Sequence, residues 1–193
     1  MHPAADYVVR DYDTSDEPSW LRCRVLSFLT TAYFDDVVTT KPHVKLPGFE
    51  LVAVTPHHTV VGVIDVAIDD TVATIETLAV HPDHQHRGIG HALFDVALHR
   101  VRAHNLTSIS AWTRDDVAAL SWYRAMGFRE CDHYLHVFAN HATDPDELTR
   151  AVECTRPGLN LISAFLHAEL ADEPLLRKQF ARVHTCRRFT KSL

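Results

Sequence analysis

Three segments rich in β-branched residues follow one another with only short polar turns between them. Residues 49–55, 59–68 and 71–80 are dominated by Val, Ile, Thr and Ala, a composition typical of strands. The turns at 56–58 and 69–70 leave room only for antiparallel neighbours, since a parallel crossover needs a dozen or more residues. The sequence therefore predicts a three-stranded meander at the centre of the fold.

Helical and strand patterns surround this meander. Residues 88–104 repeat apolar side chains with a 3.6-residue period, which predicts a helix. Gly127 is placed to end a second helix as its C-cap. We expect further helices over 18–30, 33–40, 116–126, 145–152 and 173–180, and further strands over 7–10, 108–113, 133–138, 159–168 and 183–189. The whole chain is predicted to be one α/β domain with a mixed sheet flanked by helices.

The length of 193 residues suits one compact domain. We divide it into a core over 1–140 and a C-terminal elaboration over 141–193 that packs on or completes the same domain. The net charge of −6 is opposite in sign to the basic surface that a nucleic-acid-binding protein usually carries, so we expect no nucleic-acid partner.

No apolar run is as long as a bilayer span, and residues 1–6 lack the pattern of a signal peptide. We therefore expect a cytoplasmic protein without a membrane partner. The sequence contains no CxxC pair, which favours free thiols in a reducing compartment. The cysteines are Cys23, Cys131, Cys154 and Cys186.

A glycine-containing loop joins the third strand of the meander to the next helix. Gly88 and Gly90 stand at the first turn of that helix, where glycine allows close approach to a ligand and backbone N–H groups are unpaired. The helix dipole adds positive potential, so the loop suits a phosphate or pyrophosphate. A tight turn without a ligand is the alternative. A dinucleotide fingerprint would need Gly or Ala in place of Leu93, and the Gly-Lys-Ser/Thr of a P-loop is absent.

Two motifs resemble those of one enzyme superfamily. The segment 85–90, Gln-His-Arg-Gly-Ile-Gly, resembles the Q/R-x-x-G-x-G/A signature of the GCN5-related N-acetyltransferase (GNAT) superfamily. Residues 118–128 resemble its later A-x-x-x-Y-x-x-x-G-F segment, and 76–82 resemble its fourth strand and the following turn. Motif order and spacing agree over roughly residues 7–138.

The resemblance implies a single-domain GNAT-like fold, with a mostly antiparallel twisted sheet splayed between its fourth and fifth strands. It also implies acetyl-CoA as co-substrate. Backbone groups of Leu78, Ala79 and Val80 would pair with the pantetheine arm, and the amides of Gln85, His86, Arg87, Gly88, Ile89 and Gly90 would hold the pyrophosphate. Asp116 either lies near the pantetheine or caps the helix that follows it. The N-terminal helical region would wall the acceptor site. Of its aromatic residues Trp20, Phe28, Tyr33 and Phe34, most would pack in the core and one or two would line the acceptor pocket.

The family's reaction moves an acetyl group directly to a primary amine, and we favour a small-molecule amine. An alkylammonium with a pKa of about 10.4 must lose a proton before it attacks. Tyr123 matches the family's tyrosine and is assigned as the general acid for the departing thiolate, the alternative being a core aromatic. Glu76 is the candidate base, because strand alternation over 71–80 puts it on one face with Val72, Thr74, Leu78 and Val80, and apolar neighbours raise the pKa of a carboxyl group. The alternative is a solvated or Arg-paired strand residue. The base positions of two known subgroups hold Thr74 and Ala111 instead.

Other functions remain open on the sequence alone. A protein or peptide N-acetyltransferase would use the same chemistry on a peptide amine, and a non-catalytic acyl-CoA-binding regulatory module would use only the coenzyme site. We expect no metal, because His81, His84 and His86 lack the further ligands that zinc requires. Homodimers are common in this superfamily, so the resemblance allows a homodimer.

Overall fold

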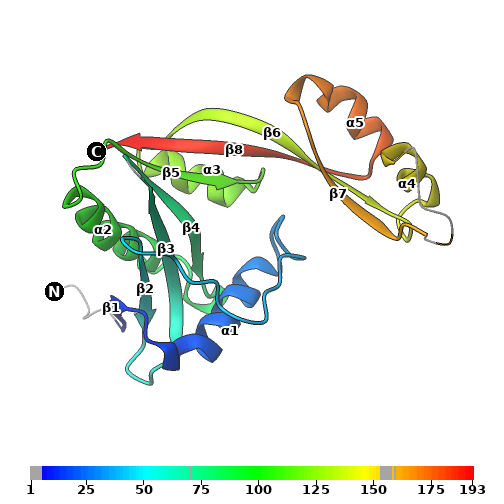
Figure 1. The fold of residues 1–193 in the computed structure, drawn as a ribbon. Helices are drawn as coiled ribbons and strands as arrows, with labels where there is room; N and C mark the ends of the chain where they lie inside the picture. Colours follow the sequence, from blue (N-terminus) through cyan, green and yellow to red (C-terminus); the bar gives the residue numbers. More distant parts are fainter. Residues whose placement is uncertain (1–5, 70, 153–157, 159) are drawn as a thin grey trace.

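The computed structural model describes residues 6–69, 71–152, 158 and 160–193. The strands form one eight-stranded sheet in the order β1-β2-β3-β4-β5-β8-β6-β7 (Figure 1). Among the described strands, β4 and β5 are the one parallel pair, so the sheet is mostly antiparallel, as the resemblance implied. The strands are β1 (Val8–Asp11), β2 (Phe49–Val54), β3 (Val60–Asp69), β4 (Val72–Val80), β5 (Ser108–Thr113), β6 (Arg129–Asn140), β7 (Ser163–Ala168) and β8 (Arg182–Ser192).

Helices cover both faces of this sheet. Three short 3-10 turns and five α-helices are described, and none of these helices is long and apolar enough to cross a membrane. The first helix packs mainly on β3 and β4, whereas the second and third bound the main core on the other face. The helices are α1 (Glu17–Phe28), α2 (Ile89–Arg102), α3 (Val117–Ala125), α4 (Pro145–Ala151) and α5 (Glu173–Gln179).

The helix expected over residues 33–40 is wrong. This segment forms a turn and then an irregular loop that leads to β2. Two ion pairs with distant partners hold the loop, one between Asp36 and Arg24 on α1 and one between Asp35 and Arg182 on β8. Tertiary contacts of this kind override local helical propensity.

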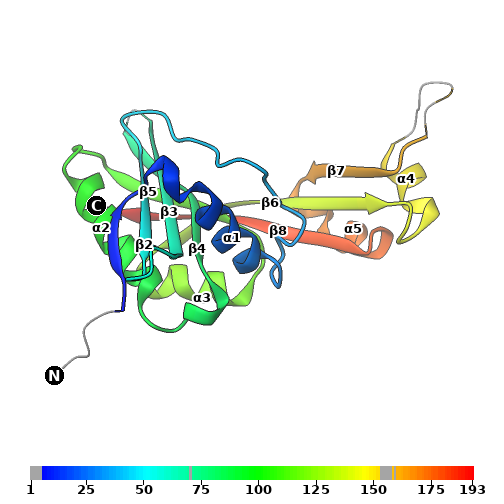
Figure 2. The same cartoon turned by 90° about the horizontal axis from the view of Figure 1, so that it is seen from below.

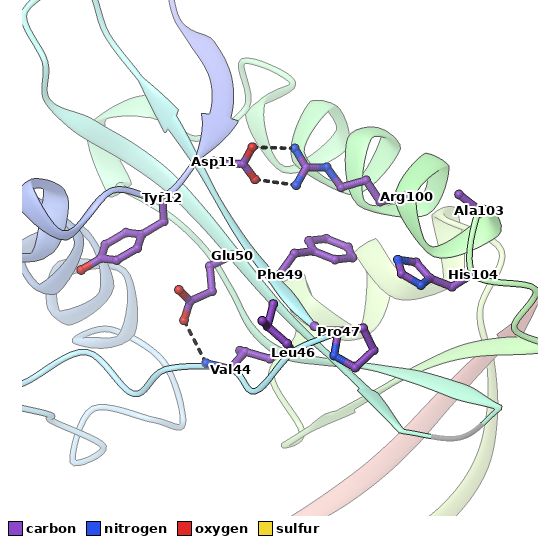
Figure 3. A pocket seen from close by; sticks show the side chains of 11 residues that line it. Asp11, Tyr12, Val44, Leu46, Pro47, Phe49, Glu50, Arg100, Ala103 and His104 are labelled. Atoms are coloured by element: carbon purple, nitrogen blue, oxygen red, sulfur yellow. Dashed lines mark hydrogen bonds and ion pairs between the residues drawn. The ribbon is translucent and has the colours of Figure 1, made fainter.

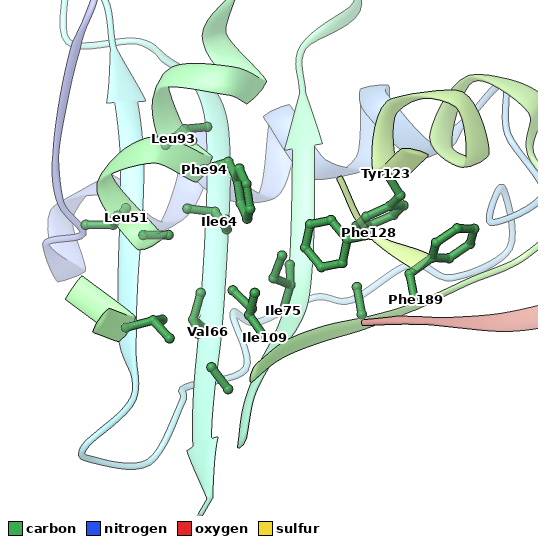
Figure 4. Close-up of a cluster of buried hydrophobic side chains, with 14 of the residues drawn as sticks. Leu51, Ile64, Val66, Ile75, Leu93, Phe94, Ile109, Tyr123, Phe128 and Phe189 are labelled. Carbon is green, nitrogen blue, oxygen red and sulfur yellow. The ribbon is translucent and has the colours of Figure 1, made fainter. Parts of the chain in front are cut away.

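The main hydrophobic core lies between the sheet and helices α2 and α3 (Figure 4). Leu51, Ile64 and Ile109 from the sheet meet Leu93 from α2, and all four are fully buried. Phe189 of β8 belongs to the same core and is also fully buried. A smaller cluster under α1 contains Trp20 and Val52, with Phe28 packed against it.

Strands β6 and β8 extend past the main core and carry a separate cluster (Figures 1 and 2). We call the outer part of β6, helices α4 and α5, strand β7 and the start of β8 the distal lobe. Its core includes Leu135, Leu148 and Val183, on the face that α4 and α5 cover. The segment after residue 140 thus supplies both this lobe and β8, which lies between β5 and β6.

Candidate active site

Strands β4 and β5 pair over only four residues and then separate. Their ladder runs from the Val72–Ser108 pair to the Ile75–Ala111 pair. Beyond that point β4 continues to Val80 along β3, while β5 stays paired with β8. In the described structure, the edge of β4 over residues 76–80 therefore has no strand partner on the β5 side, and its backbone groups border an opening in the sheet.

A β-bulge in β4 stands at the start of this opening. Thr77 lies opposite Asp65 and Ile75 opposite Val66, so Glu76 is the extra residue on β4. A bulge bends its strand and increases the local twist, which accounts for the departure of β4 from β5 at this point.

The bulge also changes which face Glu76 occupies. Strict alternation along β4 would put Glu76 on the same face as Leu78, among apolar neighbours. Instead, Ile75 and Leu78 both contact the main core, so the alternation breaks between them. Glu76 lies outside that core and is exposed. The premise that Glu76 has an apolar environment is therefore wrong, because a bulge shifts the period of two on which it rested.

The glycine loop has the backbone conformation of an anion-binding turn. His86 and Gly88 have φ angles of 61° and 80°, on either side of Arg87. Left-handed residues next to ordinary ones point successive N–H groups into one concavity, which suits an anion. Gly88 is the N-cap of α2, and a Cβ placed on it would meet nothing within 4 Å. Residues 85–88 of the loop are exposed.

Two side chains, Gln85 and Trp122, connect the glycine loop to neighbouring elements. Gln85 Nε2 donates a hydrogen bond to the carbonyl oxygen of Val80 at 3.1 Å, which joins the loop to the end of β4. The indole of Trp122 lies beside Gly90, since a Cβ built on Gly90 would be 3.6 Å from Nε1. The sequence did not predict this contact, because Trp122 lies on α3, about thirty residues after the loop, and only the packing of α3 beside α2 brings them together.

Asp116 caps helix α3. Its Oδ1 accepts a hydrogen bond from the backbone N–H of Ala119 at 3.0 Å. The capping alternative is therefore confirmed. A contact between Asp116 and a pantetheine arm stays a prediction.

Tyr123 is a core aromatic residue on α3, 7% exposed (Figure 4). Its ring stacks on Phe189 with 5.4 Å between centroids, and Trp122 and Phe128 contact it edge to face. Burial raises the pKa of the Tyr123 hydroxyl well above its ordinary value, and the nearby Tyr33 hydroxyl adds a smaller effect. The raised pKa keeps the hydroxyl protonated at neutral pH, so it is present as a hydrogen-bond donor and is a weaker acid than an exposed tyrosine.

A buried charge cluster that sequence reasoning missed lies on the α1 face. Lys41 Nζ is 2.5 Å from Glu50 Oε1 and 3.3 Å from Asp65 Oδ1, and the Lys41 side chain is fully buried. Nζ also lies 4.8 Å from the ring centroid of Tyr12. Burial raises the pKa of Asp65 to about 6, and Lys41 opposes that rise. The sequence signal was Asp65 itself, a charged residue inside an apolar strand.

A groove of about 840 Å³ lies between residues 33–36 and the distal lobe. Tyr33 and Phe34 line it, whereas Trp20 and Phe28 pack under α1. The Tyr33 hydroxyl accepts a hydrogen bond from the backbone N–H of Arg114 at 2.8 Å. Because Arg114 directly follows β5, this end of the groove lies next to the opening between β4 and β5.

A second hollow, of about 530 Å³, lies elsewhere (Figure 3). The ion pair between Asp11 and Arg100 crosses one side of it, and Phe49 lies below the guanidinium. Arg100 stands near the C-terminal end of α2, opposite the end that carries the glycine loop. This hollow is separate from the opening in the sheet.

Three of the four cysteines lie within the described residues. Cys23 and Cys186 are buried and Cys131 is exposed, all three as free cysteines, while Cys154 lies outside the described residues. Within the part of the chain that the structure describes, no group of three or more His, Cys, Asp or Glu side chains is arranged to hold a metal ion.

The fold matches known proteins. The model of the acetyltransferase (GNAT) family matches residues 8–128. No curated protein matches the chain in sequence. Among solved structures, the ribosomal-protein-S18-alanine N-acetyltransferase of Escherichia coli superposes with a TM-score of 0.60 and 13% identity, over 96% of this chain and 93% of that one.

Two further structures hold the coenzyme. The PaiA N-acetyltransferase of Thermoplasma acidophilum, in complex with coenzyme A, matches with a TM-score of 0.55 and 15% identity, over 65% of this chain and 91% of that one. YncA of Salmonella typhimurium, with acetyl-CoA, gives 0.58 and 14%, over 97% and 94%. The family model covers the meander, the glycine loop and the tyrosine helix, so this chain belongs to the GNAT family of acetyltransferases.

Proposed function

We propose that this protein transfers the acetyl group of acetyl-CoA to the nitrogen of a primary amine, and that a small-molecule amine is the acceptor. The observation that carries the proposal is the opening between β4 and β5, with the glycine loop at the end of β4. An unpaired strand edge can bind an extended pantetheine arm, and the loop amides can bind a pyrophosphate.

The residues of the opening have distinct roles in this proposal. Backbone groups of Leu78, Ala79 and Val80 pair with the pantetheine arm, and the amides from Gln85 to Gly90 hold the phosphates. Arg87 is exposed on that loop and supplies positive charge. Asp116 shapes the start of α3 and lies near the pantetheine.

The chemical step needs a base, an oxyanion donor and an acid. Exposed Glu76 at the bulge takes the proton from the ammonium, directly or through water. The amine nitrogen then bonds to the carbonyl carbon, and the backbone N–H near Leu78 stabilises the oxyanion. As the carbon–sulfur bond breaks, Tyr123 gives its proton to the sulfur. The attacking nitrogen loses its second proton, through water, to the resulting tyrosinate, which restores the hydroxyl, and Glu76 returns its proton to solvent. The products are an N-acetylated amine and free coenzyme A.

A direct test combines binding with turnover. Calorimetric titration with acetyl-CoA should show binding, and a thiol-release assay over a panel of amines should show turnover with one amine class. Binding without thiol release on any amine would instead support a regulatory acyl-CoA-binding module. Peptide amines that react when small amines do not would move the acceptor to a protein or peptide. The absence of acetyl-CoA binding would overturn the proposal.

A further inference from the structure

The groove beside the opening is lined by aromatic rings from separate parts of the chain. Phe34 lies on the loop between α1 and β2, Phe138 lies on β6, and Phe165 lies on β7. Phe34 is 50% exposed and Phe165 is 54% exposed. Large aromatic side chains that remain exposed together in a groove indicate a binding surface for an apolar or aromatic group.

These rings are already arranged for stacking. Phe138 and Phe165 are register partners on β6 and β7, and their rings stack with 4.7 Å between centroids. His136 and His167, the next partners on the same face, stack at 4.9 Å. Helices α4 and α5 cover the opposite face, with the distal core. The described structure thus presents an aromatic sheet face to the groove.

The charged side chains of the groove already have partners within the protein. Arg182 makes two hydrogen bonds to Asp35, at 2.7 and 2.8 Å, and lies 3.8 Å from the Phe138 ring centroid. Asp36 pairs with Arg24. Glu147 accepts hydrogen bonds from the backbone N–H groups of two residues that line the groove. The groove therefore favours a ligand body without charge over a phosphate or a polyamine.

The inner end of the groove presents hydroxyl groups. Arg114 Nε donates to His136 Nδ1, so the neutral ring carries its hydrogen on Nε2 and donates to the Tyr134 hydroxyl at 3.0 Å. Burial, followed by the Arg114 charge, lowers the pKa of His136 to about 4 and keeps it neutral. Tyr33 stands at this same end, near Tyr123 and the opening.

We propose that the acceptor is a primary amine carried by an aromatic ring. The ring binds against Phe165 and against the layer that Phe34 and Phe138 form with the Arg182 guanidinium between them, at 4.3 and 3.8 Å from the two ring centroids, and the amine is directed past Tyr33 to the opening. This inference rests on the proposed function and names its substrate class. An arylalkylamine meets these requirements, because its ring is flat and uncharged and its amine lies at the end of a flexible arm.

The first experiment compares amines matched in size. Thiol release from acetyl-CoA would be measured with 2-phenylethylamine and tryptamine, with 2-cyclohexylethylamine as the non-aromatic match, and with putrescine and a Phe-initiated dipeptide amide. We expect kcat/KM for the aromatic amines to exceed that for the cyclohexyl amine by roughly 10-fold, because ring stacking and cation–π contacts are lost in the latter. Equal values, or a preference for putrescine or the dipeptide, would overturn the inference.

The second experiment removes one wall of the groove. Phe165→Ala should raise KM for tryptamine roughly 10-fold, while kcat and the Kd for acetyl-CoA stay unchanged. Leu175→Ala is the matched control, since Leu175 is 55% exposed on α5 and lies outside the groove. Phe34→Ala tests the opposite wall if the first variant folds poorly. Unchanged KM in both Phe variants would contradict the inference.

The two proposals fail in different ways. If aliphatic amines are acetylated and aromatic amines are not, only the substrate class is wrong. If acetyl-CoA binds and no amine releases thiol, the proposed function is wrong and the inference is wrong with it.

Discussion

Asp65 and Thr77 lie opposite each other in the β3–β4 ladder, directly beyond the bulge at Glu76. This pairing places a buried carboxylate one strand away from the opening in the sheet, with Lys41 as its partner from the loop before β2. Only β4 therefore separates the buried charge cluster from the proposed transfer site.

The raised pKa of Asp65 predicts a specific pH dependence of stability. Its folded pKa is about 6 against an ordinary value of 3.8, so the folded state binds more protons than the unfolded state between these values. The contribution of Asp65 is then most favourable below about pH 4 and is lost as the pH rises through about 6, by at most about 3 kcal/mol. Urea unfolding of the wild type and of Asp65→Asn at several pH values measures the free energy of unfolding of each. The wild-type value minus the variant value should fall as the pH rises. A pH-independent difference would show that this group does not titrate as described.

Tyr123→Phe should separate chemistry from packing. The phenyl ring keeps the stack on Phe189 and loses only the hydroxyl. We expect kcat to fall about 100-fold, the lower end of general acid catalysis, with the Kd for acetyl-CoA nearly unchanged. Tyr7→Phe, at the far edge of the sheet, is the control and should leave kcat as it is. Wild-type turnover in Tyr123→Phe would remove its role as acid.

Glu76→Gln should reduce turnover most at low pH. At neutral pH an alkylamine acceptor is mostly protonated and depends on the base, whereas near its own pKa of about 10.4 it deprotonates without help. The ratio of wild-type to variant kcat/KM should therefore be about 100 near pH 7 and shrink toward pH 9.5. Glu169→Gln, an exposed carboxylate before the 3-10 turn of the distal lobe, serves as control. A pH–rate profile identical to that of the wild type would reject Glu76 as the base.

The two loop glycines should respond differently to alanine. Gly88 has a φ of 80°, so Gly88→Ala should cost about 1–2 kcal/mol of stability. The nearest atom to a Cβ on Gly90 is 3.6 Å away, an ordinary contact, so Gly90→Ala should keep stability within about 0.5 kcal/mol. Its methyl group would still crowd a bound pyrophosphate. Thermal unfolding and calorimetric Kd for acetyl-CoA distinguish the two effects, and tight acetyl-CoA binding by Gly90→Ala would argue against close approach at that residue.

Local patterns predicted the strands and helices well, and the arrangement of distant residues less well. The strand over 108–113 and the cap at Asp116 were readable because short-range chemistry determines them. The face of the strand that Glu76 occupies could not be predicted. The bulge arises from the pairing of β4 with β3, and nothing in the β-branched sequence of β4 marks its position. The groove could not be predicted either, because its walls join Phe34 to Phe165 across more than half of the chain.

The position of β8 has a consequence for the order in which the protein can be completed during synthesis. Residues 182–192 pair with β5 on one side and β6 on the other, although they follow both by many residues. While a ribosome is still making the segment before residue 182, those two strands are without their shared neighbour, and Phe189 is missing from the core beneath Tyr123. The meander can form earlier, but the tyrosine's surroundings and the aromatic groove are assembled only after β8 has emerged.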